Sequence, residues 1–330
     1  MRGGLPWKAR ACGLVVVALV AAGCGTSSSG ESGTPASGDV TVETDQGPVS
    51  IPSDPEKVVV LNSGLTGYLY ALDVPVTATI PVPANGTEDG FSEFWADEAT
   101  AAGTTVLPWS PDGFDFEAIL AQEPDVIIGG GQGMPAVQAA EVYDRLTDIA
   151  PTVLLSNELT TWDEQLSFLG EQVFGKQDEL TELMDAYTAR AEEIESSIAR
   201  PEGPVTYLLM TAERVPYLLP EDSDLPSLMA DLGFEAEPVT RRHPELERVS
   251  SGDSLRFAEE QLGELVSTPT VFVVGFHQDV TSDELAGNPL YAGLPAFEAD
   301  RAFDLPDWTY RADYQAVMAT LDHVAEQFAA

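Results

Sequence analysis

Histidine, cysteine and glycine are the residue types whose positions in this chain could carry chemistry. The three histidines, His243, His277 and His323, are far apart and lack the clustered spacing of a zinc site. The sequence contains neither a Gly-x-Ser-x-Gly elbow nor a His-Glu-x-x-His motif. We therefore expect no catalytic residue, no metal site and no resident cofactor.

Cys24 offers a different chemistry, the acylation of a thiol. It follows a short apolar run that begins near Ala11, and Arg2, Lys8 and Arg10 precede that run. This pattern predicts a secretory signal peptide over residues 1–23, and the run is too short for a spanning helix.

The end of this segment resembles a bacterial lipobox, in which the cysteine is acylated and becomes the first residue of the mature protein. The matching stretch is Leu19-Val20-Ala21-Ala22-Gly23-Cys24, with Ala21 where Leu is commoner. An ordinary secretory cut beside an incidental cysteine is the alternative. Cys12 leaves with the signal, so no disulfide can form within the mature protein.

The net charge excludes several kinds of partner. Asp and Glu number 55 against 15 Lys and Arg, which gives a formal charge of −40. Such a field repels nucleic acid and anionic lipid, so membrane attachment would depend on acyl chains such as palmitate. At 44% hydrophobic residues, the chain can still bury a large core.

Short apolar runs alternate with helical patterns, which indicates parallel, helix-covered sheets. A helical period also runs from Asp178 to Arg200, and Pro201 ends it. We expect an α/β fold of two lobes with mainly parallel sheets, joined by one long rigid helix. The other expected elements are a hairpin (40–43 and 49–51), strands at 57–61, 76–80, 126–128, 152–155, 205–210 and 270–274, and helices at 116–122, 136–149, 225–232, 256–265 and 314–328.

These patterns divide the chain into five parts. A signal peptide (1–23) precedes a Gly/Ser-rich flexible tether (24–39). The amino-terminal lobe covers 40–160, the interlobe helix region 161–201 and the carboxyl-terminal lobe 202–330.

A glycine-rich loop follows the strand at 126–128. It contains Gly131-x-Gly133-x-x-Ala136, which is similar to a dinucleotide fingerprint. A nicotinamide cofactor is not expected outside the cell. The favoured interpretation is a loop whose bare backbone lets a bulky ligand approach.

Several stretches, in this order and behind a lipobox, resemble the solute-binding lipoproteins of iron–siderophore and vitamin B12 importers. They are Val58–Gly64, Phe116–Ile128, Tyr143–Val153, Phe257–Leu262 and Asn288–Phe297. The resemblance implies two α/β lobes, one long connecting helix and limited closure on a ligand.

The resemblance also implies a function. The protein would be a monomer, lipid-anchored outside the bacterial cytoplasmic membrane, that captures a ferric siderophore and delivers it to the permease and ATPase of an ABC importer. Glu141 and Glu260 would be the acidic residues that dock on the permease.

We expect the ligand between the lobes, in loops that follow strands. Arginine and aromatic side chains suit the oxygens and planes of a ferric chelate. The family places a ligand-stacking tryptophan at the position of Trp308. The complete set of candidates is Trp109, Gln132, Met134, Arg214, Tyr217, Arg241, Arg242, His277, Trp308 and Tyr310.

Other functions stay open at this point. Haem or a corrinoid could replace the siderophore, and Tyr217, Tyr310 or His277 could be an axial ligand of haem. An exported enzyme on the same scaffold would need a nucleophile or metal constellation. An adhesin would need no cleft of aromatic and arginine side chains.

Overall fold

The computed structural model describes residues 38–82, 86–249, 252–278 and 280–330. All of them belong to one compact unit, Pro35–Ala330. The signal peptide, Cys24 and most of the expected tether lie outside the described residues.

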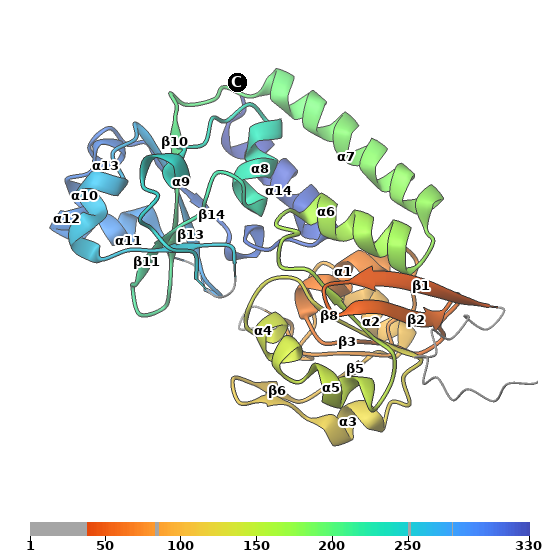
Figure 1. Ribbon diagram of the computed structural model, residues 1–330. Coiled ribbons are helices and arrows are strands. Elements are labelled where there is room, and N and C mark those ends of the chain that lie inside the picture. Colours follow the sequence, from red (N-terminus) through yellow and green to blue (C-terminus); the bar gives the residue numbers. More distant parts are fainter. Residues whose placement is uncertain (1–37, 83–85, 250–251, 279) are drawn as a thin grey trace, which may run out of the picture. The chain divides into compact units, whose positions relative to one another are not determined.

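The amino-terminal lobe is built on a parallel five-stranded sheet (Figure 1). Four of its strands are almost wholly buried, as expected where helices cover both faces, whereas the edge strand at 105–106 is partly exposed. Their order is β5 (Thr105–Val106), β4 (Ala78–Thr79), β3 (Val58–Val60), β8 (Val126–Gly130) and β9 (Thr152–Leu155).

Among the described residues, five helices and two hairpins complete this lobe. The single helix expected over 136–149 is wrong, because Val142 leaves the helical conformation (φ −113°, ψ 17°) and separates α4 from α5. The helices are α1 (Ser63–Ala71), α2 (Ala96–Ala102), α3 (Phe116–Leu120), α4 (Met134–Glu141) and α5 (Tyr143–Thr147); the hairpins pair β1 (Asp39–Thr44) with β2 (Gly47–Pro52) and β6 (Trp109–Ser110) with β7 (Gly113–Phe114).

A helical region with one interruption, at residues 174–176, leads from one lobe to the other. α6 (Trp162–Ser167) begins with a capping box of Thr161 and Glu164, and a π-helical segment (Phe168–Val173) follows it. α7 (Gln177–Ser197) is the long helix that the sequence predicts, and Figure 1 shows it running without a break. At about 1.5 Å per residue, it is roughly 30 Å long.

The carboxyl-terminal lobe contains a second, separate five-stranded sheet. β10 (Val205–Met210), β13 (Thr270–Gly275) and β14 (Ala302–Leu305) are parallel, whereas β11 (Pro216–Leu218) and β12 (Leu255–Arg256) pair antiparallel at one edge. The lobe's helices are α8 (Asp224–Asp231), α9 (Val239–Arg242), α10 (Leu262–Leu265), α11 (Ser282–Ala286), α12 (Pro289–Ala292), α13 (Pro295–Glu298) and α14 (Tyr314–Gln327), with 3-10 turns at Glu259–Gln261 and Asp307–Thr309.

The helix expected over 256–265 is also wrong at its start. Arg256 pairs with Tyr217 in the sheet, and Ala258 is extended (φ −84°, ψ 141°). The chain turns helical only from Glu259, because the preceding residues extend the sheet edge.

One hydrophobic core joins the lobes. Its buried members include Val60 and Leu65 from the first lobe and Val205 and Phe272 from the second. α14 packs against α1, α6 and α7. This helix of the carboxyl-terminal lobe therefore contacts both the amino-terminal lobe and the helical region between the lobes. The lobes therefore share apolar surface that neither could bury alone.

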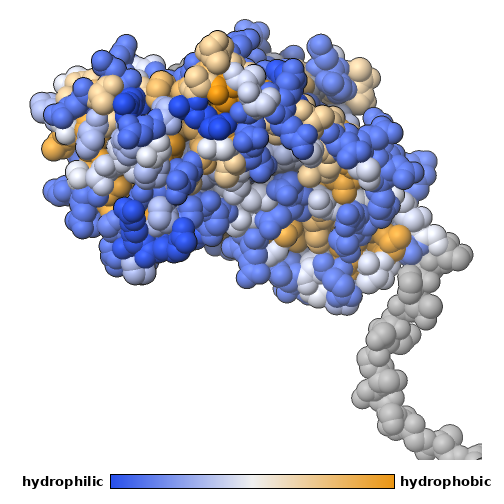
Figure 2. Space-filling view, turned by 90° about the horizontal axis from the view of Figure 1, so that it is seen from above, coloured by the Kyte–Doolittle hydropathy of each residue, from blue (hydrophilic) through white to orange (hydrophobic). Residues whose placement is uncertain are grey.

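The outer surface is largely polar. On the face shown in Figure 2, hydrophilic residues predominate and apolar residues are scattered among them. Within the described ranges, no helix is long and apolar enough to cross a membrane.

Truncation of α14 at the shared core should destabilise the protein. Leu321 is fully buried, so we expect Leu321→Ala to lower the free energy of unfolding by about 2–5 kcal/mol. Urea denaturation measures this loss. The exposed Leu290 (53%) is the control, and Leu290→Ala should change stability by about 0.5 kcal/mol or less. Equal effects of the two substitutions would contradict the role of α14.

Candidate functional site

An opening of about 190 Å³ lies where the carboxyl ends of the two parallel strand sets meet. The amino-terminal lobe supplies Trp109 from β6 and Met134 from the start of α4. The carboxyl-terminal lobe supplies Phe276 and His277, which follow β13, and Trp308 from the turn before α14. A ligand in this opening would contact both lobes.

Aromatic rings form much of its wall. Phe94 and Trp308 meet edge to face across the lobes, with ring centroids 5.1 Å apart. The indole nitrogen of Trp109 donates a 2.8 Å hydrogen bond to Gln138, which fixes that ring. Met134 is 53% exposed and available to a bound molecule.

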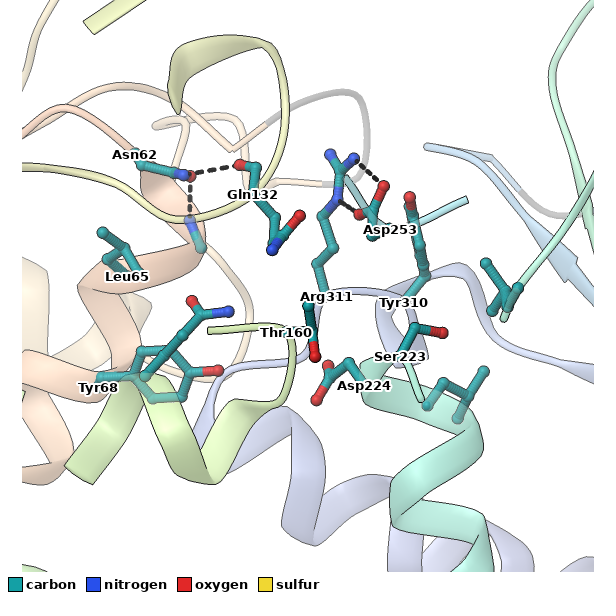
Figure 3. A pocket seen from close by; sticks show the side chains of 14 residues that line it. Asn62, Leu65, Tyr68, Gln132, Thr160, Ser223, Asp224, Asp253, Tyr310 and Arg311 are labelled. Atoms are coloured by element: carbon teal, nitrogen blue, oxygen red, sulfur yellow. Dashed lines mark hydrogen bonds and ion pairs between the residues drawn. The ribbon is translucent and has the colours of Figure 1, made fainter. Parts of the chain in front are cut away.

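A smaller pocket of about 30 Å³ adjoins the opening, with room for little more than water. Figure 3 shows Asn62 and Gln132 on one side and Tyr310 and Asp224 on the other, with Arg311 between them. The side-chain amide of Asn62 donates to the carbonyls of Gly130 and Gln132 at 2.8 and 2.9 Å. It therefore holds the glycine loop against the start of α1.

Arg311 and Asp253 form a two-point ion pair in this pocket (Figure 3). Nε of Arg311 donates to one carboxylate oxygen, and Nη2 donates to the other at 3.1 Å. The guanidinium also lies 4.8 Å from the ring centroid of Tyr310. Its charge and several of its donors are thus engaged within the protein.

Two residues of the site have a strained backbone. His277 and Arg311 have φ angles of 58° and 59°, a left-handed conformation that non-glycine residues rarely adopt. The side chain of Arg311 is packed closely against the glycine loop, since a Cβ at Gly133 would lie 2.7 Å from Nη1 of Arg311. Gly133, which belongs to the loop predicted to admit a ligand, therefore leaves room for an arginine of the other lobe.

Hydrogen bonds also tie the first lobe to the start of α14. The hydroxyl of Tyr68 donates to the carbonyl of Ala312 at 2.9 Å. The indole nitrogen of Trp95 donates to Asp313 at 2.9 Å, and Asp313 caps α14. Burial raises the pKa of Asp313 to about 6.

Asp224 and His277 also have displaced pKa values. Removal from water raises the pKa of Asp224 to about 7, against a hydrogen bond from the backbone of Trp162 that lowers it. Burial, aided by the charge of Arg311, lowers the pKa of His277 to about 4. His277 is therefore a neutral imidazole at pH 7.

The structure brings six of the ten predicted ligand contacts to the opening. These are Trp109, Gln132, Met134, His277, Trp308 and Tyr310. Gln132 is nearly buried and its side-chain amide donates to the carbonyl of Asn157 at 2.9 Å, so part of its role is structural.

The other four candidates do not line the opening. Arg214 pairs with Glu284, Arg241 lies 3.7 Å from Glu221, and Arg242 pairs with Glu237 at 2.8 Å. Nearby carboxylates hold these arginines because acids greatly outnumber bases in the chain. Tyr217 sits on β11 and packs against the shared core.

The sequence prediction missed Phe94, Phe276 and Arg311. Arg311 lies in the same short run as Trp308 and Tyr310, which was the available signal. The two predicted docking residues, Glu141 and Glu260, are both exposed and belong to different lobes. Among the described residues, no group of His, Cys, Asp and Glu side chains could hold a metal ion.

Comparison with known proteins gives consistent matches. A family model described as periplasmic binding protein matches residues 58–309. The ferric enterobactin-binding periplasmic protein FepB of Escherichia coli is 27% identical over 288 residues, which cover 86% of this chain and 89% of FepB. The iron(3+)-hydroxamate-binding protein FhuD of Bacillus subtilis is 24% identical, with 69% and 68% covered.

Solved structures show the same fold. The crystal structure of holo-ViuP superposes with a TM-score of 0.76 at 22% identity, covering 88% of this chain and 95% of that chain. At this identity, the likeness concerns the arrangement of the lobes and not the ligand.

Loss of the partner of Arg311 should be costly. Asp253 is almost buried (4% exposed), so Asp253→Ala would leave a largely buried guanidinium uncompensated and lower stability by about 3–5 kcal/mol. The matched control is Asp322→Ala, which removes the surface partner of Arg190 (61% and 33% exposed) and should cost about 1 kcal/mol or less. Urea denaturation compares the two, and a cost for Asp253→Ala no larger than for the control would refute this view of the pair.

Proposed function

The chain belongs to the periplasmic binding protein family, and we propose that it captures a ferric siderophore in the opening between its lobes and delivers it to an ATP-driven importer. The observation that carries the proposal is a wall of aromatic side chains contributed by both lobes at facing strand ends. Flat chelating groups can stack on such rings. Relatives named for ferric enterobactin and for iron(3+)-hydroxamate bind ligands of this kind.

The proposal involves no chemical change in the ligand. Family members are binding proteins, and the displaced pKa values of this site have structural causes. Asp313 caps a helix and Asp224 accepts a backbone hydrogen bond, so each carboxyl group is already engaged. Capture and release would follow from limited lobe motion.

Haem is the second candidate ligand, and one observation favours it. His277 lines the opening as a neutral imidazole, the form that binds a metal. Its ring lies against Phe276, with centroids 3.9 Å apart. Titration with haemin beside ferric siderophores separates the two ligands.

Delivery would require recognition of both lobes by the permease. Glu141 at the end of α4 and Glu260 in the turn before α10 are exposed carboxylates that could pair with permease cations. We propose them as docking residues, and the protein acts in this scheme as a monomer.

Trp308 should carry much of the binding energy. Its ring lines the opening and meets Phe94, so we expect Trp308→Ala to weaken ferric siderophore binding by about 10- to 100-fold, within the range of interface hot spots. Isothermal titration calorimetry of the purified protein, with a panel of ferric siderophores, haemin and cobalamin, measures the affinities.

Arg214→Ala is the matched control for this experiment. Arg214 pairs with Glu284 and does not line the opening, so its removal should leave affinity within about twofold of the parent. If Arg214→Ala abolished binding while Trp308→Ala did not, the assignment of the site would fail.

We also propose that acylated Cys24 anchors the protein outside the cytoplasmic membrane. Cys24→Ala should then abolish incorporation of labelled palmitate and move the protein from the membrane fraction to the soluble fraction. Cys12→Ala is the control and should change neither result, because residue 12 is removed with the signal. Retention of Cys24→Ala in the membrane would argue for a different anchor.

A further inference from the structure

The charges around the opening restrict the kind of chelate that it can hold. The basic side chains that line it are Arg311 and His277, and the carboxylates are Glu93, Asp307 and Asp313. His277 contributes no positive charge at neutral pH, because its pKa is about 4. Arg311 is therefore the one permanent cation among the described residues of the wall.

The charge of Arg311 is already compensated. Both oxygens of the Asp253 carboxylate accept from its guanidinium. Asp253 is 4% exposed at the side chain and Arg311 22%, so the pair is largely withdrawn from water. An anionic ligand would have to compete with a carboxylate held at two points.

Other cations do not fill this gap. Arg214, Arg241 and Arg242 each lie beside a glutamate and outside the wall of the opening. The positions between the described ranges, 83–85, 250–251 and 279, hold no lysine, arginine or histidine. The sequence as a whole adds a formal charge of −40.

The charge of a ferric chelate depends on its chelating groups. Three hydroxamates, each singly negative, neutralise Fe³⁺, whereas three doubly negative catecholates leave three excess negative charges. Moving such an anion from water into an opening without a free countercharge is costly. A neutral complex avoids this cost, and a cationic one gains from the acidic surroundings.

We propose that the ligand is a neutral or positively charged ferric tris-hydroxamate, and not an anionic tris-catecholate. This inference rests on the proposed function and makes it specific. The apolar wall supports it, because Phe94, Trp109, Met134 and Trp308 offer surface to the hydrocarbon spacers between hydroxamate groups. Glu93, an exposed carboxylate of the wall, would favour a pendant ammonium group.

The test compares chelates of different charge by calorimetry on the purified protein. The probes are ferrioxamine B, which carries one ammonium group, its N-acetylated neutral form, and ferric enterobactin, a tris-catecholate. We expect both hydroxamates to bind at least about a hundredfold more tightly than the catecholate. The reason is that bringing like charges together at an interface lowers the binding affinity by a large factor. Ferrioxamine B should bind with higher affinity than its acetylated form.

A pair of variants separates charge from shape. Glu93→Gln should reduce the preference for ferrioxamine B over its acetylated form by about threefold. Glu98→Gln is the control, because Glu98 is an exposed glutamate of α2 that does not line the opening, and it should leave the preference unchanged.

The outcomes distinguish this inference from the proposed function. If ferric enterobactin bound as tightly as the hydroxamates or more tightly, the charge argument would be wrong and siderophore capture would stand. If no ferric chelate bound while haemin or cobalamin did, both proposals would fall. If Glu93→Gln and Glu98→Gln changed the preference for ferrioxamine B equally, Glu93 would not be the group that favours the ammonium.

Discussion

The ion pair between Arg311 and Asp253 is the constraint on which the site depends. It places a guanidinium at the junction of the two lobes, against the glycine loop of the first lobe and the ring of Tyr310. Because the pair is largely withdrawn from water, neither partner can leave without exposing an uncompensated charge. The left-handed backbone of Arg311 is tolerated for the same reason.

The segment from Trp308 to Asp313 concentrates most of the roles in the site. Trp308 and Tyr310 line the opening, Arg311 closes the adjoining pocket, and Asp313 caps α14 while accepting from Trp95. Since α14 then enters the core common to both lobes, the side chains of this segment that line the opening are anchored at the start of a helix packed in that core. Rigid support of this kind preorganises a binding wall.

The architecture could be predicted well from the sequence because it depends on local patterns of apolar and polar residues. The strands at 152–155 and 205–210 match β9 and β10, and the rod expected over 178–200 is α7 (Gln177–Ser197). Apolar runs and one long helical period suffice for such elements. The predicted helices over 136–149 and 256–265 were wrong because the backbone leaves the helical conformation at Val142 and Ala258. The spacing of apolar residues gives no sign of these changes.

The site was harder to predict, because electrostatic pairing is a property of the folded chain. Position after a strand selected Trp109, His277 and Trp308, and all three line the opening. The same rule failed to place Arg214 in the wall, since spatial proximity to Glu284 is not visible in the sequence. Arg311 escaped notice for the converse reason, because only the folded structure shows it beside Asp253.

The hydrophobic core shared by both lobes also bears on how a bound ligand would be released. Two halves that share buried apolar surface resist being pulled apart, because separation would hydrate side chains from both. In the proposed function, the work of separating the lobes from a bound ligand would therefore come from the importer that receives it.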